Sequence, residues 1–126
     1  MIDEKTGASR VRVGIHVLAD FHGCPPVQLQ DETRLMTLFH DALVRAGFHI
    51  LDRVSHKFPG EGSGVTGMFL VSQSHVAFHT YPERRFLALD LFTCGDADPD
   101  QVVDEVGEIL QAEQVTQWRR DRGRVE

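Results

Sequence analysis

The chain has 126 residues, of which 41% are hydrophobic and 25% are charged, and its formal net charge is −6. This length is typical of one domain, residues 1–126, with a core large enough to fold. The acidic balance argues against nucleic acid as the main partner, because proteins that bind it neutralise phosphates with Lys and Arg.

The amino-terminal segment, M-I-D-E-K-T-G-A-S-R, is polar and has no apolar core, so we expect no secretory signal. No apolar run elsewhere has the length of a membrane span, and no membrane partner is expected. The two cysteines, Cys24 and Cys94, do not make a disulfide framework. A reducing, cytoplasmic location is the simplest interpretation, and it leaves Cys94 as a free thiol.

The first part of the chain predicts a strand, a helix and a second strand. Alternating valines favour a strand from Val11 to Leu18. Asp31 can cap a helix that runs to about Ala46 and stops at Gly47. Phe48 to Phe58 is typical of a second strand. The apolar residues of the helix fall on one face at helical spacing: Leu35, Leu38, Phe39, Ala42, Leu43 and Ala46.

The middle of the chain predicts a β-hairpin. A glycine-rich loop, residues 59–64, leads into two strands, Val65 to Val71 and Ser74 to Tyr81. A tight turn at Ser72 and Gln73 joins them. With a two-residue turn, Val71 pairs with Ser74 and Thr66 pairs with His79.

The last part of the chain predicts a strand, a helix and a final strand. Pro82 ends the hairpin, because proline cannot donate to a ladder. Phe86 to Phe92 is almost continuously apolar and predicts a central strand buried on both faces, in which Asp90 needs a partner. Asp98 and Pro99 open a second helix with the apolar stripe Val102, Val106, Ile109 and Leu110. Gln114 to Arg119 is the last strand.

This order of elements predicts the fold class. A strand, a helix, three or four strands, a helix and a strand are typical of an α+β fold. We expect a two-layer α/β sandwich, with a mainly antiparallel sheet and two helices on one face.

The reactive side chains gather in two short segments. The run from Ser72 to Glu83, S-Q-S-H-V-A-F-H-T-Y-P-E, carries a hydroxyl, two imidazoles and a carboxylate, and L-F-T-C-G adds the thiol of Cys94. These groups, in an apolar and strand-like setting, are what a chain needs to turn one of its own serines into an electrophile.

These segments resemble the small prokaryotic S-adenosylmethionine decarboxylases, which cleave themselves and carry a pyruvoyl group. The resemblance extends over nearly the whole chain. The blocks that carry it are G-I-H-V-L-A-D-F-H-G-C (Gly14 to Cys24), G-V-T-G around Thr66, S-H-V-A-F-H-T-Y-P-E (Ser74 to Glu83), D-L-F-T-C-G (Asp90 to Gly95) and D-R-G-R (Asp121 to Arg124).

The resemblance implies cleavage between Gln73 and Ser74. The Ser74 hydroxyl would attack the Gln73 carbonyl to give an ester, and loss of the Ser74 α-proton would expel the ester and leave dehydroalanine. Hydrolysis with loss of ammonia would then leave a pyruvoyl group at the start of an α chain, residues 74–126, beside a β chain, residues 1–73. A pyruvoyl group is the self-made counterpart of pyridoxal phosphate, for which this chain, with lysine only at Lys5 and Lys57, has no convincing phosphate cradle.

The resemblance also implies two helpers for cleavage. Thr66 would hydrogen-bond the oxyanion, and His79 would handle the α-proton of Ser74. Yet His79 lies five residues along the strand from Ser74, roughly 16 Å away. We therefore expect a homodimer in which Thr66 and His79 act on Ser74 of the partner subunit.

In turnover, the resemblance implies that Cys94 donates a proton to Cα of the product. Glu83 would bind substrate hydroxyls, and Phe58 and Tyr81 would stack on an adenine or lie against a sulfonium. The implied substrate is S-adenosylmethionine, a cationic amino-acid-type molecule, on the route to the polyamine spermidine.

Two alternatives stay open. Arg84 and Arg85 follow Glu83 and the loop P-G-E-G-S-G is slightly enlarged, which leaves room for a pyruvoyl decarboxylase of ornithine or arginine. Gln73 stands where the family usually has glutamate, which leaves room for an unprocessed regulatory pseudoenzyme.

Metal binding is the main chemical rival. Two sets of residues carry suitable ligand atoms: His16, Asp20, His22 and Cys24 in one, and His75 and His79 in the other. Neither spacing matches a zinc signature, so we expect no metal and leave His75 a structural residue.

Overall fold

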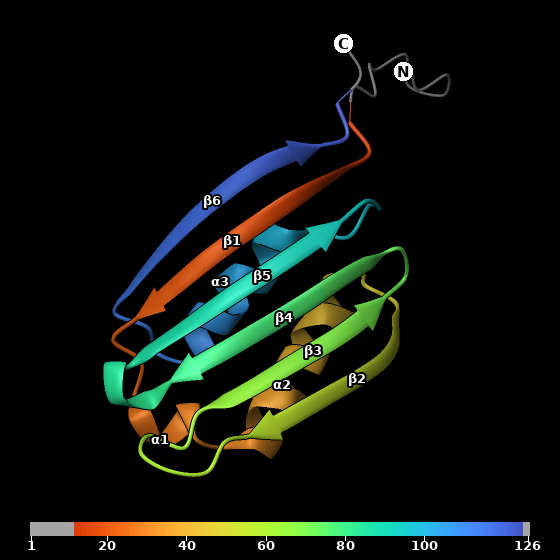
Figure 1. Cartoon of the computed structure of the whole chain (residues 1–126). Helices are drawn as coiled ribbons and strands as arrows, with labels where there is room; N and C mark the ends of the chain where they lie inside the picture. The colour runs from red at the N-terminus through yellow and green to blue at the C-terminus, as the bar shows by residue number, and fades with distance from the viewer. Residues whose placement is uncertain (1–11, 125–126) are drawn as a thin grey trace.

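Six strands form one sheet in the order β2-β3-β4-β5-β1-β6 in this computed structural model, which describes residues 12–124 (Figure 1). Every neighbouring pair of strands is antiparallel. The strands are β1 (Gly14–His22), β2 (Ile50–Lys57), β3 (Val65–Val71), β4 (Ser74–Tyr81), β5 (Phe86–Thr93) and β6 (Gln114–Arg122). The helices are α1 (Pro26–Leu29), α2 (Glu32–Arg45) and α3 (Pro99–Ile109), with a 3-10 turn η1 (Pro82–Arg84).

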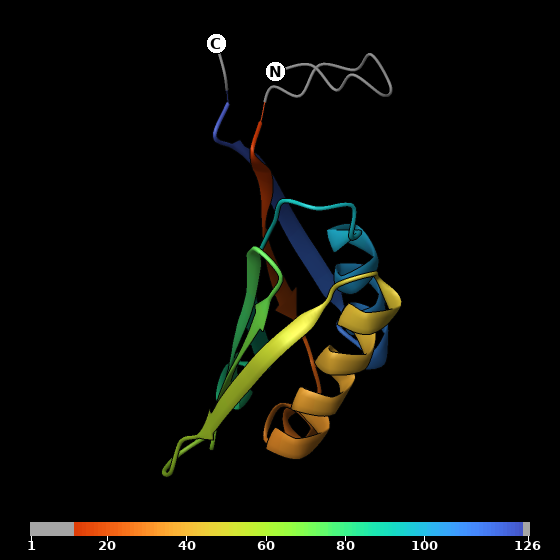
Figure 2. The same ribbon diagram turned by 90° about the vertical axis from the view of Figure 1, so that its right-hand side faces the viewer.

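The helices cover one face of the sheet and leave the other face bare, as Figure 2 shows in side view. Side chains along β4 alternate between buried and more exposed positions, as a half-covered strand requires. We call the bare side the open face; it carries His75, Ala77, His79 and Tyr81 of β4. The predicted α+β two-layer sandwich is therefore confirmed.

Both main helices begin at the predicted caps. The Asp31 side chain accepts a hydrogen bond from the backbone N–H of Arg34 at 3.0 Å. The Asp98 side chain accepts from the N–H groups of Asp100 and Gln101. Such bonds satisfy donors that the first turn of a helix leaves unpaired. None of the helices among the described residues is long and apolar enough to cross a membrane.

The core lies between the helices and the covered face of the sheet. Phe39 of α2 stacks on Phe78 of β4, with ring centroids 4.3 Å apart. Gly67 of β3 makes room for this pair, since a Cβ there would lie 2.3 Å from the Phe78 ring. The tight packing fixes β3 against β4 and so fixes the hairpin that carries Ser74.

Some predicted boundaries were wrong. Strand β1 continues to His22 and β6 to Arg122, because the two strands pair along their whole length. Val11, the predicted start of the first strand, lies outside the described residues. Strand β5 is central but not buried on both faces, because no layer covers its open-face side chains. The short elements α1 and η1 were not predicted, since each is a single turn of helix around a proline.

Candidate active site

The turn between β3 and β4 holds the expected cleavage point. Val71 pairs with Ser74, so the turn has the two predicted residues, Ser72 and Gln73. Gln73 has φ 57°, a left-handed conformation that residues with a side chain rarely adopt. The Ser72 N–H donates to the carbonyl of His49 at 2.9 Å, which holds the turn from the other side. The peptide bond between Gln73 and Ser74 thus lies in a strained turn that is fixed at both ends.

Cys94 lies against this peptide bond. Its thiol donates to the Gln73 carbonyl oxygen at 3.0 Å, and its backbone N–H donates to the Ser74 hydroxyl at 3.4 Å. Ser74 Oγ and Cys94 Sγ are 4.0 Å apart. We call Gln73, Ser74 and Cys94 the turn group: it joins a nucleophilic hydroxyl, an acyl carbon and a proton donor.

The contact between Cys94 and the Gln73 carbonyl was not predicted. The contact follows from the register between β4 and β5. His75 pairs with Phe92, and this pairing brings the end of β5, next to Cys94, to the turn. Beside the thiol lies a cavity of 190 Å³, lined by Arg12, Gly14 and Asp96 among others. Of the turn group, Cys94 is the residue that lines this space, whereas Ser74 is 8% exposed and does not line it.

Thr66 and His79 meet on the open face. They pair across β3 and β4 as predicted, and Thr66 Oγ1 and His79 Nδ1 share a hydrogen bond of 2.8 Å. The bond orients the imidazole and fixes which ring nitrogen remains free. Neither residue contacts the turn group, because β4 carries His79 about 16 Å from Ser74.

The residues expected to bind substrate lie toward the same end of the sheet as Thr66 and His79. Tyr81 ends β4, Glu83 lies in η1, and Phe58 follows β2. Phe58 and Tyr81 are 50% and 44% exposed. Glu83 packs under the glycine-rich loop, where a Cβ on Gly62 would lie 2.1 Å from its carboxylate. With Thr66 and His79 they make what we call the far group, toward the opposite end of the sheet from the turn group (Figure 1).

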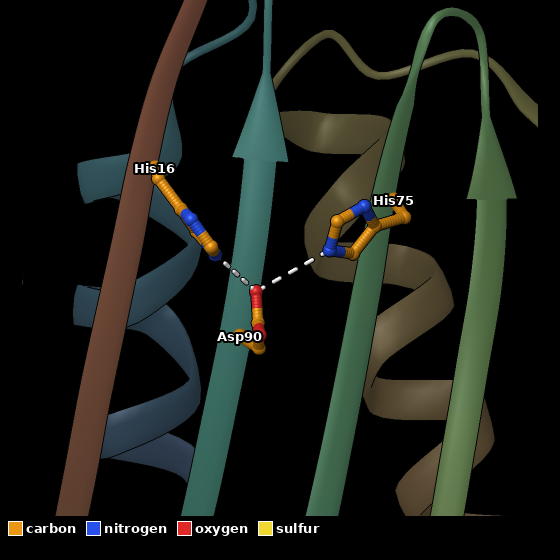
Figure 3. Close-up of side chains that lie close together, drawn as sticks. All are labelled: His16, His75 and Asp90. Carbon is orange, nitrogen blue, oxygen red and sulfur yellow. Dashed lines mark hydrogen bonds and ion pairs between the residues drawn. The ribbon is translucent and has the colours of Figure 1, made fainter. Parts of the chain in front are cut away.

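A third cluster joins three strands of the open face. His16 Nε2 lies 2.5 Å from Asp90 Oδ1, and His75 Nε2 lies 3.3 Å from the same oxygen (Figure 3). Asp90 thus has the partners that its apolar strand demands.

This cluster differs from the two sets of ligand-type residues in the sequence. Within residues 12–124, His16 converges with Asp90 and His75 rather than with Asp20, His22 and Cys24. Cys24 is fully buried in the core, and burial raises the pKa of its thiol.

The fold and the turn group together point to a class of protein. A half-covered antiparallel sheet with a hydroxyl, a thiol and a strained peptide bond gathered at one turn supplies the groups that a self-cleaving chain needs. A family model described as S-adenosylmethionine decarboxylase matches residues 15–123, and the chain belongs to this family.

Individual relatives agree over most of their length. The S-adenosylmethionine decarboxylase proenzyme of Parasynechococcus marenigrum (strain WH8102) is 39% identical over 102 residues, covering 80% of this chain and 78% of the relative. That of Clostridium tetani (strain Massachusetts / E88) is 34% identical over 112 residues, covering 88% and 87%. The crystal structure of the adenosylmethionine decarboxylase from Aquifex aeolicus VF5 superposes with a TM-score of 0.81 at 26% identity, covering 91% of this chain and 94% of that chain.

Proposed function

We propose that this chain decarboxylates S-adenosylmethionine, for polyamine synthesis, with a pyruvoyl group that it makes from its own Ser74. Family membership and the relatives' names support the activity. The observation that carries the proposal is the turn group, in which the Cys94 thiol donates to the carbonyl of the peptide bond to be cut. The free thiols of Cys24 and Cys94 suit the reducing cytoplasm, which we keep as the location.

Cleavage begins with attack of the Ser74 hydroxyl on the Gln73 carbonyl carbon. Negative charge then develops on the carbonyl oxygen, and the Cys94 thiol already donates to that oxygen. The left-handed conformation of Gln73 raises the energy of the uncut turn by about 1 kcal/mol, which assists its rearrangement. The products are a β chain, residues 1–73, and an α chain, residues 74–126.

The residues around Ser74 fit a pyruvoyl group at this position. Ser74 is 8% exposed at the start of β4, and it lies next to Cys94, which lines a cavity of 190 Å³. The new terminus would therefore be shielded from solvent, with space for a small molecule beside the thiol. The group supplies an electron sink for the loss of carbon dioxide. The Cys94 thiol then holds the proton that the product needs at Cα.

A second copy of the chain completes the site. The turn group contains no base that could take the α-proton of Ser74. The far group contains such a base, His79, but no Ser74 of the same chain lies within its reach. Two-fold packing of the open faces brings the far group of one protomer to the turn group of its partner. The open face suits such burial, since one row across it contains exposed apolar side chains: Val54, Met68, Leu18 and Trp118.

In this arrangement His79 takes the α-proton of Ser74 of the partner subunit, and Thr66 stabilises the oxyanion. Glu83 accepts hydrogen bonds from substrate hydroxyls, and Phe58 and Tyr81 present aromatic faces to the adenine or the sulfonium. Cleavage should therefore require side chains from two protomers.

Co-expression of Ser74→Ala and His79→Ala chains tests this sharing. In a mixed dimer the intact His79 of one chain faces the intact Ser74 of the other, so we expect the His79→Ala chain to be cut. Intact mass spectrometry measures the fragments. The matched control replaces the Ser74→Ala chain by a Ser74→Ala/His79→Ala double variant, which should not restore cleavage. If the His79→Ala chain is cut no more in the mixture than in the control, His79 does not act across the dimer, and the sharing is contradicted.

Release of carbon dioxide tests the substrate. Cleaved protein is incubated with carboxyl-labelled S-adenosylmethionine, ornithine or arginine, and labelled carbon dioxide is counted. We expect release from S-adenosylmethionine, because an adenine and a sulfonium match the aromatic side chains of the far group. Release from ornithine or arginine alone would contradict S-adenosylmethionine as the substrate. An uncut, inactive chain would favour the regulatory pseudoenzyme.

A further inference from the structure

The cluster on the open face has no part in the proposed reaction. His16 comes from β1, Asp90 from β5 and His75 from β4, which are three adjacent strands (Figure 3). All three side chains point to the same side of the sheet and converge on one point between the strands. One nitrogen of each imidazole and one carboxylate oxygen of Asp90 all lie within 4.8 Å of one another.

The sheet holds these side chains in place. His16 and His75 both pair with Phe92, from opposite sides, and Asp90 lies two residues before it on β5. The Phe92 ring packs edge-on against His16 at 6.0 Å and stacks on His75 at 6.1 Å. Both imidazoles are thus braced by the same aromatic ring, so little side-chain freedom is lost when they bind a common ligand.

We propose that His16, His75 and Asp90 bind a divalent transition metal of the zinc type. Zinc takes imidazole nitrogen and carboxylate oxygen at about 2.0–2.2 Å, which sets tetrahedral ligands about 3.3 Å apart. The His75–Asp90 contact already has this length at 3.3 Å, and the His16–Asp90 contact at 2.5 Å must open by less than about 1 Å. The fourth position is left for water.

In the isolated chain, before the open faces pack together, the cluster is accessible to an ion from solution. The side chains of His16, Asp90 and His75 are 22%, 43% and 48% exposed. A bound ion would link β1, β5 and β4 on the open face, at the end of β4 where Ser74 lies. The inference does not rest on the proposed function, because all three ligands belong to one protomer and none is altered by cleavage.

Arg122 is the natural competitor of the metal. Its guanidinium donates to His16 Nδ1 at 3.1 Å, so without metal the proton of His16 is on Nε2 and points to Asp90. A metal on Nε2 requires the proton on Nδ1, where it faces the arginine donor. Arg122 lies on β6 with an exposed side chain that can swing away. Binding of zinc therefore moves the His16 proton from Nε2 to Nδ1 and breaks the contact with Arg122.

Zinc titration of the purified full chain tests the site. We expect one zinc ion per chain, and a loss of affinity of about tenfold or more in His75→Ala and in Asp90→Asn. His22→Ala is the matched control, because it removes an imidazole from the same strand and face as His16. Absence of zinc binding, wild-type affinity in Asp90→Asn, or an equal loss in His22→Ala would overturn the site. The Ser74→Ala chain should bind zinc equally, which separates this result from any failure of cleavage.

A second pair of variants tests the ligand His16 without removing it. Arg122→Met should tighten zinc binding by about threefold or more, since the competing donor is gone. Arg120→Met is the control, because Arg120 is the residue of β6 that pairs with His16 in the sheet. Unchanged or weaker binding in Arg122→Met would contradict coordination through His16. Cobalt in place of zinc adds a spectroscopic readout, and its visible absorption bands should be lost in Asp90→Asn.

Discussion

The variant Ser74→Ala is expected to remain a single chain of 14.2 kDa with no decarboxylase activity. Alanine has no hydroxyl to attack the Gln73 carbonyl, so neither the ester nor the carbonyl group derived from it can form. Intact mass spectrometry measures the chain, and a hydrazine reagent measures the carbonyl. The loss should be complete, because no other hydroxyl lies beside the scissile bond in the turn group.

The matched control for this variant is Ser72→Ala. Ser72 lies two residues away in the same hairpin, and it holds the turn through its backbone N–H, which alanine keeps. We expect Ser72→Ala to be cut at the normal rate. A cleaved Ser74→Ala chain, or an uncut Ser72→Ala chain, would show that Ser74 is not the serine that attacks the peptide bond.

The variant Cys94→Ala is expected to lose activity in two separable ways. Cleavage should slow by about 10²-fold, because a donor to the Gln73 carbonyl oxygen is gone. In the chains that do cleave, turnover should fall by about 10²–10⁴-fold, because the proton donor for the product is missing. The cleaved fraction is measured by mass spectrometry, and kcat is then expressed per cleaved chain.

Two further cysteine variants separate these roles. Cys94→Ser keeps a short donor near the carbonyl, so cleavage should recover more than turnover. Cys24→Ala removes the other thiol, which is fully buried and has a raised pKa, and both rates should stay near those of the unaltered chain. Equal rates in Cys94→Ala and in the unaltered chain would remove Cys94 from the mechanism.

Local sequence patterns predicted the hairpin well. The bounds of β3 and β4 and the pairing of Thr66 with His79 followed from two alternating segments and a two-residue turn. The caps Asp31 and Asp98 could also be predicted from the sequence, because a capping side chain bonds to the first turn of the helix that it begins. These features depend on residues close together in the chain.

Features that depend on distant residues were less predictable. The lengths of β1 and β6 follow from their pairing with each other, which joins residues about a hundred positions apart. The partners of Asp90 come from β1 and β4, and no local pattern links His16 to His75. Cys94 was predicted for turnover, but its contact with the Gln73 carbonyl depends on the register between β4 and β5.

The strand order has a consequence for the mature protein. After a cut before Ser74, strands β1, β2 and β3 belong to one polypeptide and β4, β5 and β6 to the other. Strand β1 lies between β5 and β6, so the two polypeptides are interleaved rather than side by side. They cannot part without breaking the ladders on both sides of β1 and dismantling the core. Such a cut would therefore sever the backbone and leave a unit of two polypeptides that unfolds as one body.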